Sequence, residues 1–391
     1  MSSPHIGDGE ASLTDEFSQF RSFRVLGPKR IDSGVNALEQ LPKIVRTLNA
    51  KRLLFATSTS VANKTPHARR VRDLLGDAIV AEYPGCRAHT PEQDIHAIIA
   101  ALDAHAADAV VSLGGSSVFD AVKVAASRHA NSRGTAPIPQ IAIPTTLSAG
   151  EFSPGAGFTE QQSGSKQLLL DLRVAPQYVI LDPTVTVDTP EILWLSSGVK
   201  AMDHAMEAIW SRKPHPYVDA LALQAIRLLT QYLPQTRGND DLGARGACQM
   251  AAWMSISGVG AAGMRLSHFL GHQIGAHMHI SHGVTSCVLL PTVMRFLRED
   301  TLEAQIRIAH AMNIDRAGRS DRDFAAAAAD SLEQMIGEMG LPTTISAAGG
   351  SIEAIDAVAD SSFAAAQSLG LTHDLPAGTQ SIRKILMTAW T

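Results

Sequence analysis

Histidine side chains are concentrated in one short stretch of the chain. Five of the 15 histidines lie within residues 268–282, which read HFLGHQIGAHMHISH, and His204 precedes them. Imidazoles gathered in this way typically bind a metal ion, relay protons or do both. His268 and His272 are four residues apart, so they project from one face if the segment is helical. Any one of them could be an ordinary core or surface residue, but five together favour a functional site.

A segment upstream contributes a lysine and two carboxylates. Residues 197–208 read SGVKAMDHAMEA. On the predicted helix, Lys200 and His204 share one face, and Asp203 and Glu207 share another. The alternative interpretation is an amphipathic helix whose charged side faces solvent.

A glycine turn is predicted to bind phosphate. The segment LGGSSVFDAVK (113–123) follows a predicted strand and opens a predicted helix. Adjacent glycines let backbone N–H groups approach a phosphate, and the helix N-terminus favours an anion. The spacing is not GxGxxG, so the usual dinucleotide fingerprint is absent, and a serine-capped helix after a glycine turn is the alternative. The predicted phosphate-binding residues are Gly114, Gly115, Ser116 and Ser117.

A second polar loop follows the next predicted strand. Residues 143–151 read IPTTLSAGE. The hydroxyls of Thr145, Thr146 and Ser148 could hydrogen-bond a pyrophosphate or a nicotinamide. Ordinary turn chemistry is the alternative interpretation.

Alternating strands and helices are predicted to position these loops. Short apolar runs predict strands, and runs of 3.6-residue periodicity between them predict helices. This alternation is typical of a parallel α/β sheet. The predicted strands are 52–57, 78–84, 109–115, 139–146 and 177–183, and the helices are 67–76, 92–106 and 117–130.

The second half of the chain has a different pattern. From Pro190 onward, long Ala-, Leu- and Met-rich stretches predict an all-helical domain. The predicted domains are a loose polar arm at 1–22, an α/β dinucleotide-binding domain with a parallel Rossmann-like sheet at 23–189, and an all-α catalytic domain at 190–391. The predicted helices of the last are 191–211, 217–233, 243–278, 285–299, 301–312, 322–339, 351–369 and 378–390.

Composition excludes several classes of protein. The net charge of −5 offers no electrostatic footprint for nucleic acid. Three cysteines without CxxC spacing argue against a disulfide framework or cysteine-ligated zinc. No signal peptide or membrane-spanning apolar run is evident. We therefore expect a cytoplasmic protein.

Taken together, these segments resemble the iron-containing (group III) alcohol dehydrogenase superfamily. The resemblance runs from about residue 23 to the end, and it implies a dehydroquinate synthase-like fold and hydride transfer with NADH or NADPH. The matching residues are the 114–117 turn with Asp120 and Lys123, PTT at 144–146, Asp182-Pro183, His204, His268, His272 and His282-Gly283.

Three positions depart from the pattern of this superfamily. Ser116 replaces a third glycine, and Ser281 replaces the proline before His282. More seriously, Lys200 stands where the superfamily has a metal-binding aspartate. An ammonium repels a divalent cation and removes an anionic ligand, so we expect no catalytic metal, although three histidines could still hold zinc.

The maleylacetate reductases, a branch of this superfamily, also lack that aspartate. The short loop PTTLSAGE (144–151) and the segment DLRVAPQYVILDPTVT (171–186) resemble theirs, whereas Asp120 matches the metal enzymes better. This branch implies metal-independent, NAD(P)H-dependent reduction of an acidic oxo or enoate substrate, as of maleylacetate to 3-oxoadipate in the degradation of aromatic compounds.

The resemblance also assigns roles to individual residues. For catalysis we place His268 and His272 nearest the reacting atoms, supported by His204 and His282. Lys200, with Arg173 or Arg265, would pair with a substrate carboxylate, although Lys200 could instead form a structural salt bridge or a Schiff base. The predicted cofactor-binding residues are Gly114, Gly115, Ser116, Ser117, Asp120, Thr145, Thr146, Ser148 and Lys166.

Some properties stay open at this stage. Residues 56–60 (ATSTS) contain no acid to bind a ribose 2′-hydroxyl, so NADPH is as plausible as NADH. A metal-dependent alcohol or aldehyde dehydrogenase, or a non-redox lyase or binding protein on the same scaffold, are the competing functions. We expect a homodimer that acts on small molecules.

Overall fold

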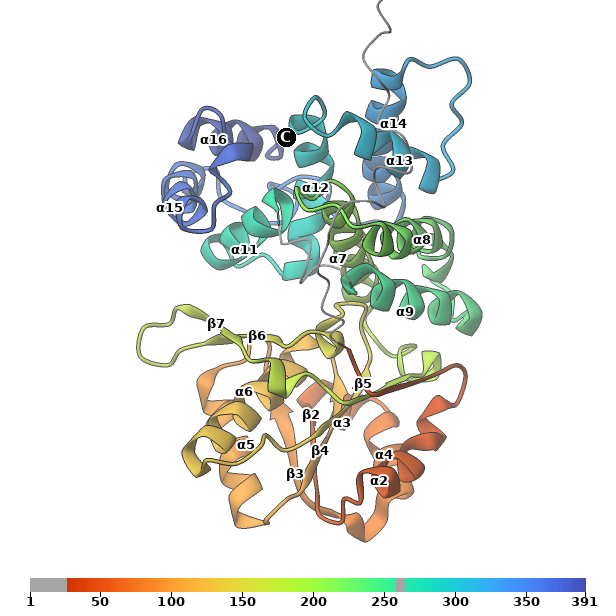
Figure 1. The fold of residues 1–391 in the computed structure, drawn as a ribbon, viewed down its shortest axis with the longest axis vertical. Helices are drawn as coiled ribbons and strands as arrows, with labels where there is room; N and C mark the ends of the chain where they lie inside the picture. The colour runs from red at the N-terminus through yellow and green to blue at the C-terminus, as the bar shows by residue number, and fades with distance from the viewer. Residues whose placement is uncertain (1–26, 258–264) are drawn as a thin grey trace, which may run out of the picture.

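The computed structural model describes residues 27–257 and 265–391. It has a sheet-containing half and a helical half, as Figure 1 shows from bottom to top. This confirms the predicted fold class. The arm predicted at 1–22 lies outside the described residues.

The first half is built on a six-stranded parallel sheet of order β1-β8-β5-β4-β2-β3. The central strands are buried runs of small and branched apolar residues, as expected of a parallel sheet covered on both faces. The strands are β1 (Arg30–Ser33), β2 (Leu53–Ser58), β3 (Ile79–Cys86), β4 (Ala109–Gly114), β5 (Gln140–Pro144) and β8 (Tyr178–Leu181).

Helices cover both faces of this sheet (Figure 1). Leu41, Ile44 and Val71 belong to the core on one face, and Ile95 and Val122 belong to the core on the other. The first core packs α2 (Leu41–Leu48) and α4 (His67–Leu75), and the second packs α5 (Glu92–Ala104) and α6 (Ser116–Arg133), while α3 (Thr59–Lys64) follows β2.

The strand order has a topological switch point beside β4. From β2 the chain passes outward to β3, whereas from β4 it passes in the opposite direction to β5. Ligands of open α/β sheets bind at such a switch point, outside the carboxyl ends of the strands. Both the glycine turn at 114–117 and the loop at 144–151 follow strands at this edge. An antiparallel hairpin, β6 (Gly155–Thr159) and β7 (Lys166–Leu170), extends from the same edge.

The second half is a bundle of helices around α7 (Glu191–Ile209). Every residue of α7 from Trp194 to Ile209 is buried, so this helix has no solvated face. The other helices are α8 (Pro216–Tyr232), α9 (Leu242–Ile256), α11 (Leu266–Met278), α12 (His282–Phe296), α13 (Leu302–Ala311), α14 (Asp321–Glu338), α15 (Ala354–Ser368) and α16 (Thr379–Thr388). In the stretch predicted as one helix at 243–278, the described residues form α9 and α11, which are separate, and residues 258–264 lie outside the described residues.

Hydrogen bonds connect the two halves at the loop that follows β5. Leu147 N donates to Ser197 Oγ on α7 at 3.0 Å. Thr189 Oγ1, just before α7, donates to Thr145 O at 2.7 Å. The loop predicted to contact a cofactor therefore lies against the helix that carries Lys200. None of the helices within 27–257 and 265–391 is long and apolar enough to cross a membrane.

Candidate active site

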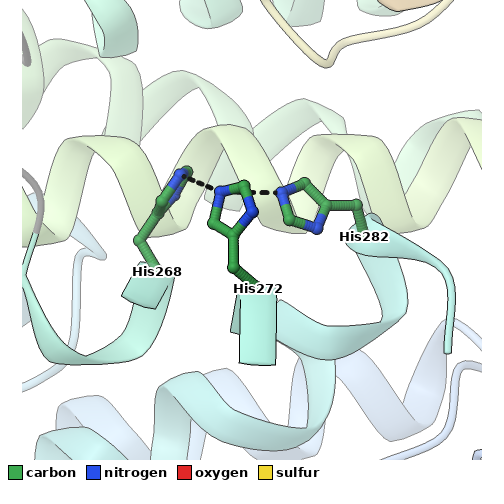
Figure 2. Close-up of side chains that lie close together, drawn as sticks. All are labelled: His268, His272 and His282. Carbon is green, nitrogen blue, oxygen red and sulfur yellow. Dashed lines mark hydrogen bonds between the residues drawn. The ribbon is translucent and has the colours of Figure 1, made fainter. Parts of the chain in front are cut away.

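Three of the predicted histidines face one another. His268 and His272 come from successive turns of α11, and His282 is the first residue of α12 (Figure 2). His272 Nε2 lies 3.0 Å from His268 Nε2 and 3.1 Å from His282 Nε2. The ring of His204, from α7, lies 5.2 Å from that of His268 between centroids. The structure thus brings together all four histidines to which catalysis was assigned.

The contacts within the cluster cannot all be satisfied by the imidazoles. A neutral imidazole nitrogen carries either one proton or one lone pair. His272 Nε2 therefore makes one full hydrogen bond, although it has two neighbouring nitrogens. Among the described residues, the buried Nδ1 atoms of His204 and His268 also have no partner. A polar atom of a ligand, or a cation, would complete these interactions.

Burial keeps the four imidazoles neutral. Burial, and then the charge of Lys200, lower the pKa of both His204 and His272 to about 3. The pKa values of His268 and His282 are also well below the usual value, chiefly because of burial. At neutral pH these rings can donate a hydrogen bond through N–H, but they do not act as imidazolium acids.

Lys200 forms a buried ion pair. Its Nζ donates to Asp203 Oδ2 at 3.2 Å, and the same oxygen accepts a hydrogen bond from Ser286 Oγ at 2.7 Å. Both side chains of the ion pair are almost completely buried. Of the three roles open for Lys200, the structure contains the salt bridge; substrate anchoring and a Schiff base stay predictions.

The metal implied by the family resemblance meets a mixed set of donors. The ligand nitrogens of His268, His272 and His282 all lie within 4.8 Å of one another, which suits a metal centre. The charge is less suited to one, because the ammonium of Lys200 lies beside the imidazoles and engages Asp203 Oδ2 together with Ser286, although Asp203 Oδ1 has no partner among the described residues. The ammonium of Lys200 repels a divalent cation, and its ion pair with Asp203 reduces this repulsion. The donor set therefore combines three suitable imidazoles with a nearby ammonium that disfavours divalent iron.

The glycine turn has the geometry of an anion site. Gly114 has a φ of +153°, and a Cβ there would lie 2.7 Å from Val118 Cγ2. Gly115 begins the 18-residue helix α6, whose N-terminus has no side-chain cap and no acidic residue in its first turn. The backbone N–H groups of this turn are therefore suited to a phosphate.

The loop after β5 packs directly on this turn. Thr145 N donates to Gly114 O at 2.9 Å, and a Cβ on Gly115 would lie 3.3 Å from Thr146 Cγ2. Thr146 Oγ1 lies 3.1 Å from Ser148 Oγ. On the other side, Ser117 O accepts a hydrogen bond from Thr90 Oγ1 at 3.2 Å. A Cβ on Gly150 would lie 2.7 Å from Ser116 Oγ, so all seven predicted residues of the two loops adjoin one another.

Asp120 was predicted to bind the cofactor, but its carboxylate points elsewhere. Its Oδ1 lies 2.8 Å from Lys123 Nζ, and its Oδ2 accepts from Gly157 N at 3.1 Å. Lys123 is completely buried and also donates to three carbonyls, those of Gly150, Ser153 and Gly155. The pair therefore fixes the loop after β5 to the hairpin. An unpaired Asp120 carboxylate would also repel a phosphate group at the glycine turn.

Of the remaining predicted residues, Lys166 lies near the histidines and Arg173 does not. Lys166 begins β7, and its charge adds to the effects of burial and Lys200 that lower the pKa of His272. Arg173 pairs with Asp171 and donates to Asn131 Oδ1 at 2.8 Å. Asn131 is 15 residues beyond Ser116 on α6, about 22 Å along the helix. The assignment of Arg173 to the substrate is therefore not supported by its position.

Arg265 is also committed to a structural contact. Its guanidinium forms an ion pair with Asp374 at 2.6 Å and hydrogen-bonds Trp210 O, and all of this is buried. Arg212 contacts the same carboxylate at 2.7 Å. Because its donors are already used inside the protein, Arg265 is not placed to bind a substrate carboxylate.

The burial of the two carboxylates of α7 was not predicted from the sequence. The alternative interpretation gave Asp203 and Glu207 a solvated face, but both are buried, with exposures of 0% and 3%. Asp203 neutralises Lys200, and Glu207 accepts hydrogen bonds from the first turn of α11. The small and apolar residues on all sides of them, interrupted only by Lys200 and His204 in GVKAMDHAMEAI, were the available signal that this helix is buried on all sides.

Comparison with known proteins assigns the chain to a family. Residues 28–183 match the family model described as iron-containing alcohol dehydrogenase. Residues 194–390 match the C-terminal domain model of the Fe-containing alcohol dehydrogenase family. Together the two models span both halves of the structure.

Individual relatives agree with this assignment. The maleylacetate reductase of Rhizobium sp. (strain MTP-10005) is 31% identical over 338 residues, which are 85% of this chain and 88% of that protein. The crystal structure of maleylacetate reductase from Agrobacterium tumefaciens superimposes with a TM-score of 0.80 at 27% identity, covering 95% of this chain and 99% of the other. A 1,3-propanediol oxidoreductase shares the fold, with a TM-score of 0.87 at 24% identity and coverage of 95% and 100%. The chain therefore belongs to the iron-containing alcohol dehydrogenase family of oxidoreductases, with maleylacetate reductases among its relatives.

Proposed function

We propose that this protein is a metal-independent, NAD(P)H-dependent reductase of an acidic oxo or enoate substrate, with maleylacetate as the leading candidate. The observation that carries the proposal is the buried ammonium of Lys200 beside four neutral imidazoles. Such a site supplies an ammonium, paired with Asp203, and neutral hydrogen-bond donors, and the ammonium disfavours a second cation. The relatives named maleylacetate reductase support the substrate class.

In this proposal the two loops at the sheet edge hold the cofactor. The free N-terminus of α6 binds the phosphates, with Thr145, Thr146 and Ser148 beside it. Lys166 contacts the ribose of the nicotinamide. A reduced nicotinamide, when bound, supplies a hydride. Either NADH or NADPH serves in this role.

The residues of α7 and α11 then stabilise the product of hydride addition. Hydride adds to the carbon–carbon double bond conjugated with a ketone, the electron pair moves to the ketone oxygen, and an enolate results. Lys200 stabilises this negative charge, and neutral N–H groups of His268 or His272 donate hydrogen bonds to it. Protonation of the enolate carbon by solvent or by a relayed proton completes the reduction.

A metal-dependent alcohol or aldehyde dehydrogenase is the second candidate. It is favoured by the three imidazole nitrogens that lie within 4.8 Å of one another. A substrate screen separates the two. The purified protein is assayed with NADH and NADPH against maleylacetate and against simple aldehydes, each with and without a chelator.

The expected result is reduction of maleylacetate that the chelator leaves unchanged. Turnover of aldehydes alone, abolished by the chelator, would refute the proposal in favour of the second candidate. Absence of both turnover and nicotinamide binding would instead favour a non-redox protein on this scaffold. We also propose a cytoplasmic homodimer; three buried free thiols, Cys86, Cys248 and Cys287, are in keeping with a reducing compartment.

A further inference from the structure

One face of α7 carries a third titratable residue besides Lys200 and His204. Glu207 lies seven residues beyond Lys200 and three beyond His204, so, contrary to the separate face predicted from the sequence, these side chains lie on the same side of α7. Lys200 and His204 face the imidazole cluster. Glu207 lies at the neighbouring helix α11, from which His268 and His272 project.

Glu207 binds the beginning of α11 with both carboxylate oxygens. Its Oε2 accepts a hydrogen bond from Arg265 N at 2.9 Å. Its Oε1 accepts from Ser267 N at 2.7 Å and from His268 N at 3.1 Å. Arg265, the N-cap residue of α11, makes no side-chain cap of its own, so Glu207 supplies this cap from another helix.

We infer that Glu207 is a positioning residue, which fixes the orientation of His268 and His272 by anchoring the first turn of α11. The inference rests on the proposed function, because it deepens the account of the same site. Glu207 hydrogen-bonds the backbone of His268 itself, and His272 follows one turn later on the same helix. Displacement of that turn would move both rings relative to Lys200 and His204.

The buried setting explains why a carboxylate is needed. Three backbone donors converge on one side chain that is 3% exposed. A carboxyl group can accept hydrogen bonds at both oxygens, even when burial raises its pKa and one oxygen carries a proton, whereas an amide presents one acceptor and one donor. In Glu207→Gln the amide nitrogen would therefore face a backbone N–H and leave it without a partner.

The test compares Glu207→Gln and Glu207→Asp with a matched control. The control variant is Asp241→Asn. In the wild type, the Asp241 carboxylate caps α9, another helix of the same half, by accepting hydrogen bonds from Gly243 N at 2.8 Å and Ala244 N at 3.0 Å. Three properties are measured on the full chain: kcat with maleylacetate, KM for the nicotinamide, and the ring ¹⁵N signals of histidine-labelled protein. If Glu207→Gln does not fold, the same three properties are measured on Glu207→Asp to test the inference.

We expect Glu207→Gln to lower kcat about 100-fold, the scale of a small misplacement of catalytic groups, with little change in KM for the nicotinamide. The ring signals of His268 and His272 should shift, and Glu207→Asp should restore part of both properties. Asp241→Asn should leave the melting temperature, kcat and the ring signals close to those of the wild type, because one amide oxygen can accept both capping hydrogen bonds.

Unchanged kcat and ring signals in a Glu207 variant would overturn the inference, and so would a loss of thermal stability alone. If the wild-type protein does not reduce maleylacetate, the proposed function fails, but the ring signals still decide the positioning role. The two failures are therefore distinguishable.

Discussion

Lys200 is the residue whose charge distinguishes this site. Its ion pair with Asp203 is buried, and its charge helps burial to hold His204 and His272 at a pKa of about 3. The histidines consequently act as neutral donors, so the positive charge at the site comes from the lysine. Four histidines and a lysine of this kind are suited to an anionic substrate or an enolate.

Removal of this charge should impair both activity and stability. We expect Lys200→Met to lower kcat/KM for an acidic enoate about 100-fold, because the developing negative charge loses its counterion. The variant should also unfold more readily by about 3–5 kcal/mol, because Asp203 is left buried and unpaired. Steady-state kinetics and urea denaturation measure the two effects.

The double variant Lys200→Met/Asp203→Asn serves as the control for Lys200→Met. It removes both charges, so it should recover stability but not activity. Wild-type kcat/KM in either variant would show that Lys200 has only a structural role.

Substitution of Arg173 should leave catalysis unchanged. Its guanidinium pairs with Asp171 and Asn131, far along α6 from the glycine turn. We therefore expect Arg173→Ala to have wild-type kcat and KM with maleylacetate in a steady-state assay. A marked rise in KM for the acidic substrate would restore the role assigned to Arg173 from the sequence.

At the residue scale, the sequence predicted the cluster but not its electrostatics. The spacing of His268 and His272 predicted a shared face, and the family pattern added His204 and His282. The structure does not support the assignment of Arg173 and Arg265 to the substrate, because both pair with carboxylates, Asp171 and Asp374, that a sequence does not show as their partners. Glu207 was missed because its role depends on three backbone N–H groups from a helix 58 or more residues away.

At the scale of elements, the cofactor site depends on two loops that pack with almost no spare room. A Cβ on Gly114 would lie 2.7 Å from Val118, and one on Gly150 would lie 2.7 Å from Ser116 Oγ. The first of these glycines also has a backbone conformation unfavourable to other residues, with a φ of +153°. The contact with α6 and the backbone conformation therefore favour glycine at position 114, whereas the loops approach each other closely at Gly150.

Alanine at Gly114 should weaken nicotinamide binding. The added methyl group would push the turn away from α6 and disturb the backbone N–H groups that face a phosphate. We expect a rise of about 10-fold or more in the Kd of NADH or NADPH, since one misplaced hydrogen bond to a charged group costs about 1.5–3 kcal/mol. Fluorescence titration of both nucleotides measures this.

Gly246→Ala is the matched control, because the nearest atom to its added Cβ, Pro183 Cγ, is 3.9 Å away. This variant should bind the nucleotides as the wild type does. Equal Kd values for Gly114→Ala and the wild type would place the phosphates elsewhere.

Periodic elements were predicted well, and irregular ones were not. Strands β2, β4 and β5 are mostly apolar runs, and α5 and α6 follow strands after short loops. The hydrophobic pattern of the sequence was therefore enough to predict these elements. Strand β1 is four residues long and reads RIDS, which has no apolar alternation, and it is held by its pairing with β8. The stretch 243–278 was predicted as one helix because apolar periodicity does not show where a helix is interrupted.

At the scale of the whole molecule, the buried histidines should make folding sensitive to acid. A histidine whose folded-state pKa is depressed contributes stability above its unfolded pKa of 6.5, and this stability is lost as the pH falls toward about 3. Burial raises the pKa values of Glu151 and Glu207 to about 8. These two residues therefore have the opposite effect, because their contribution to stability increases as the pH falls from 8 to 4.5. Below pH 6, the stability lost through the four histidines exceeds the stability gained through the two glutamates.

We therefore expect the metal-free protein to lose stability steeply between pH 6 and pH 4. Each of the four histidines contributes up to about 1.4 kcal/mol per pH unit in this range. Urea denaturation at a series of pH values gives the slope, and His204→Asn should reduce it by about one quarter of the histidine contribution. A free energy of unfolding independent of pH in this interval would mean that these rings are not buried as neutral groups.

The central claim, that Lys200 replaces the anionic ligand of a metal site, is tested most directly by metal analysis. The protein is purified without added metal, and its iron and zinc contents are measured by mass spectrometry beside those of Lys200→Asp. We predict substoichiometric metal in the wild type and a gain of bound metal in Lys200→Asp, which restores a carboxylate four residues before His204. One equivalent of iron or zinc in the wild-type protein, lost together with activity on chelation, would contradict the account.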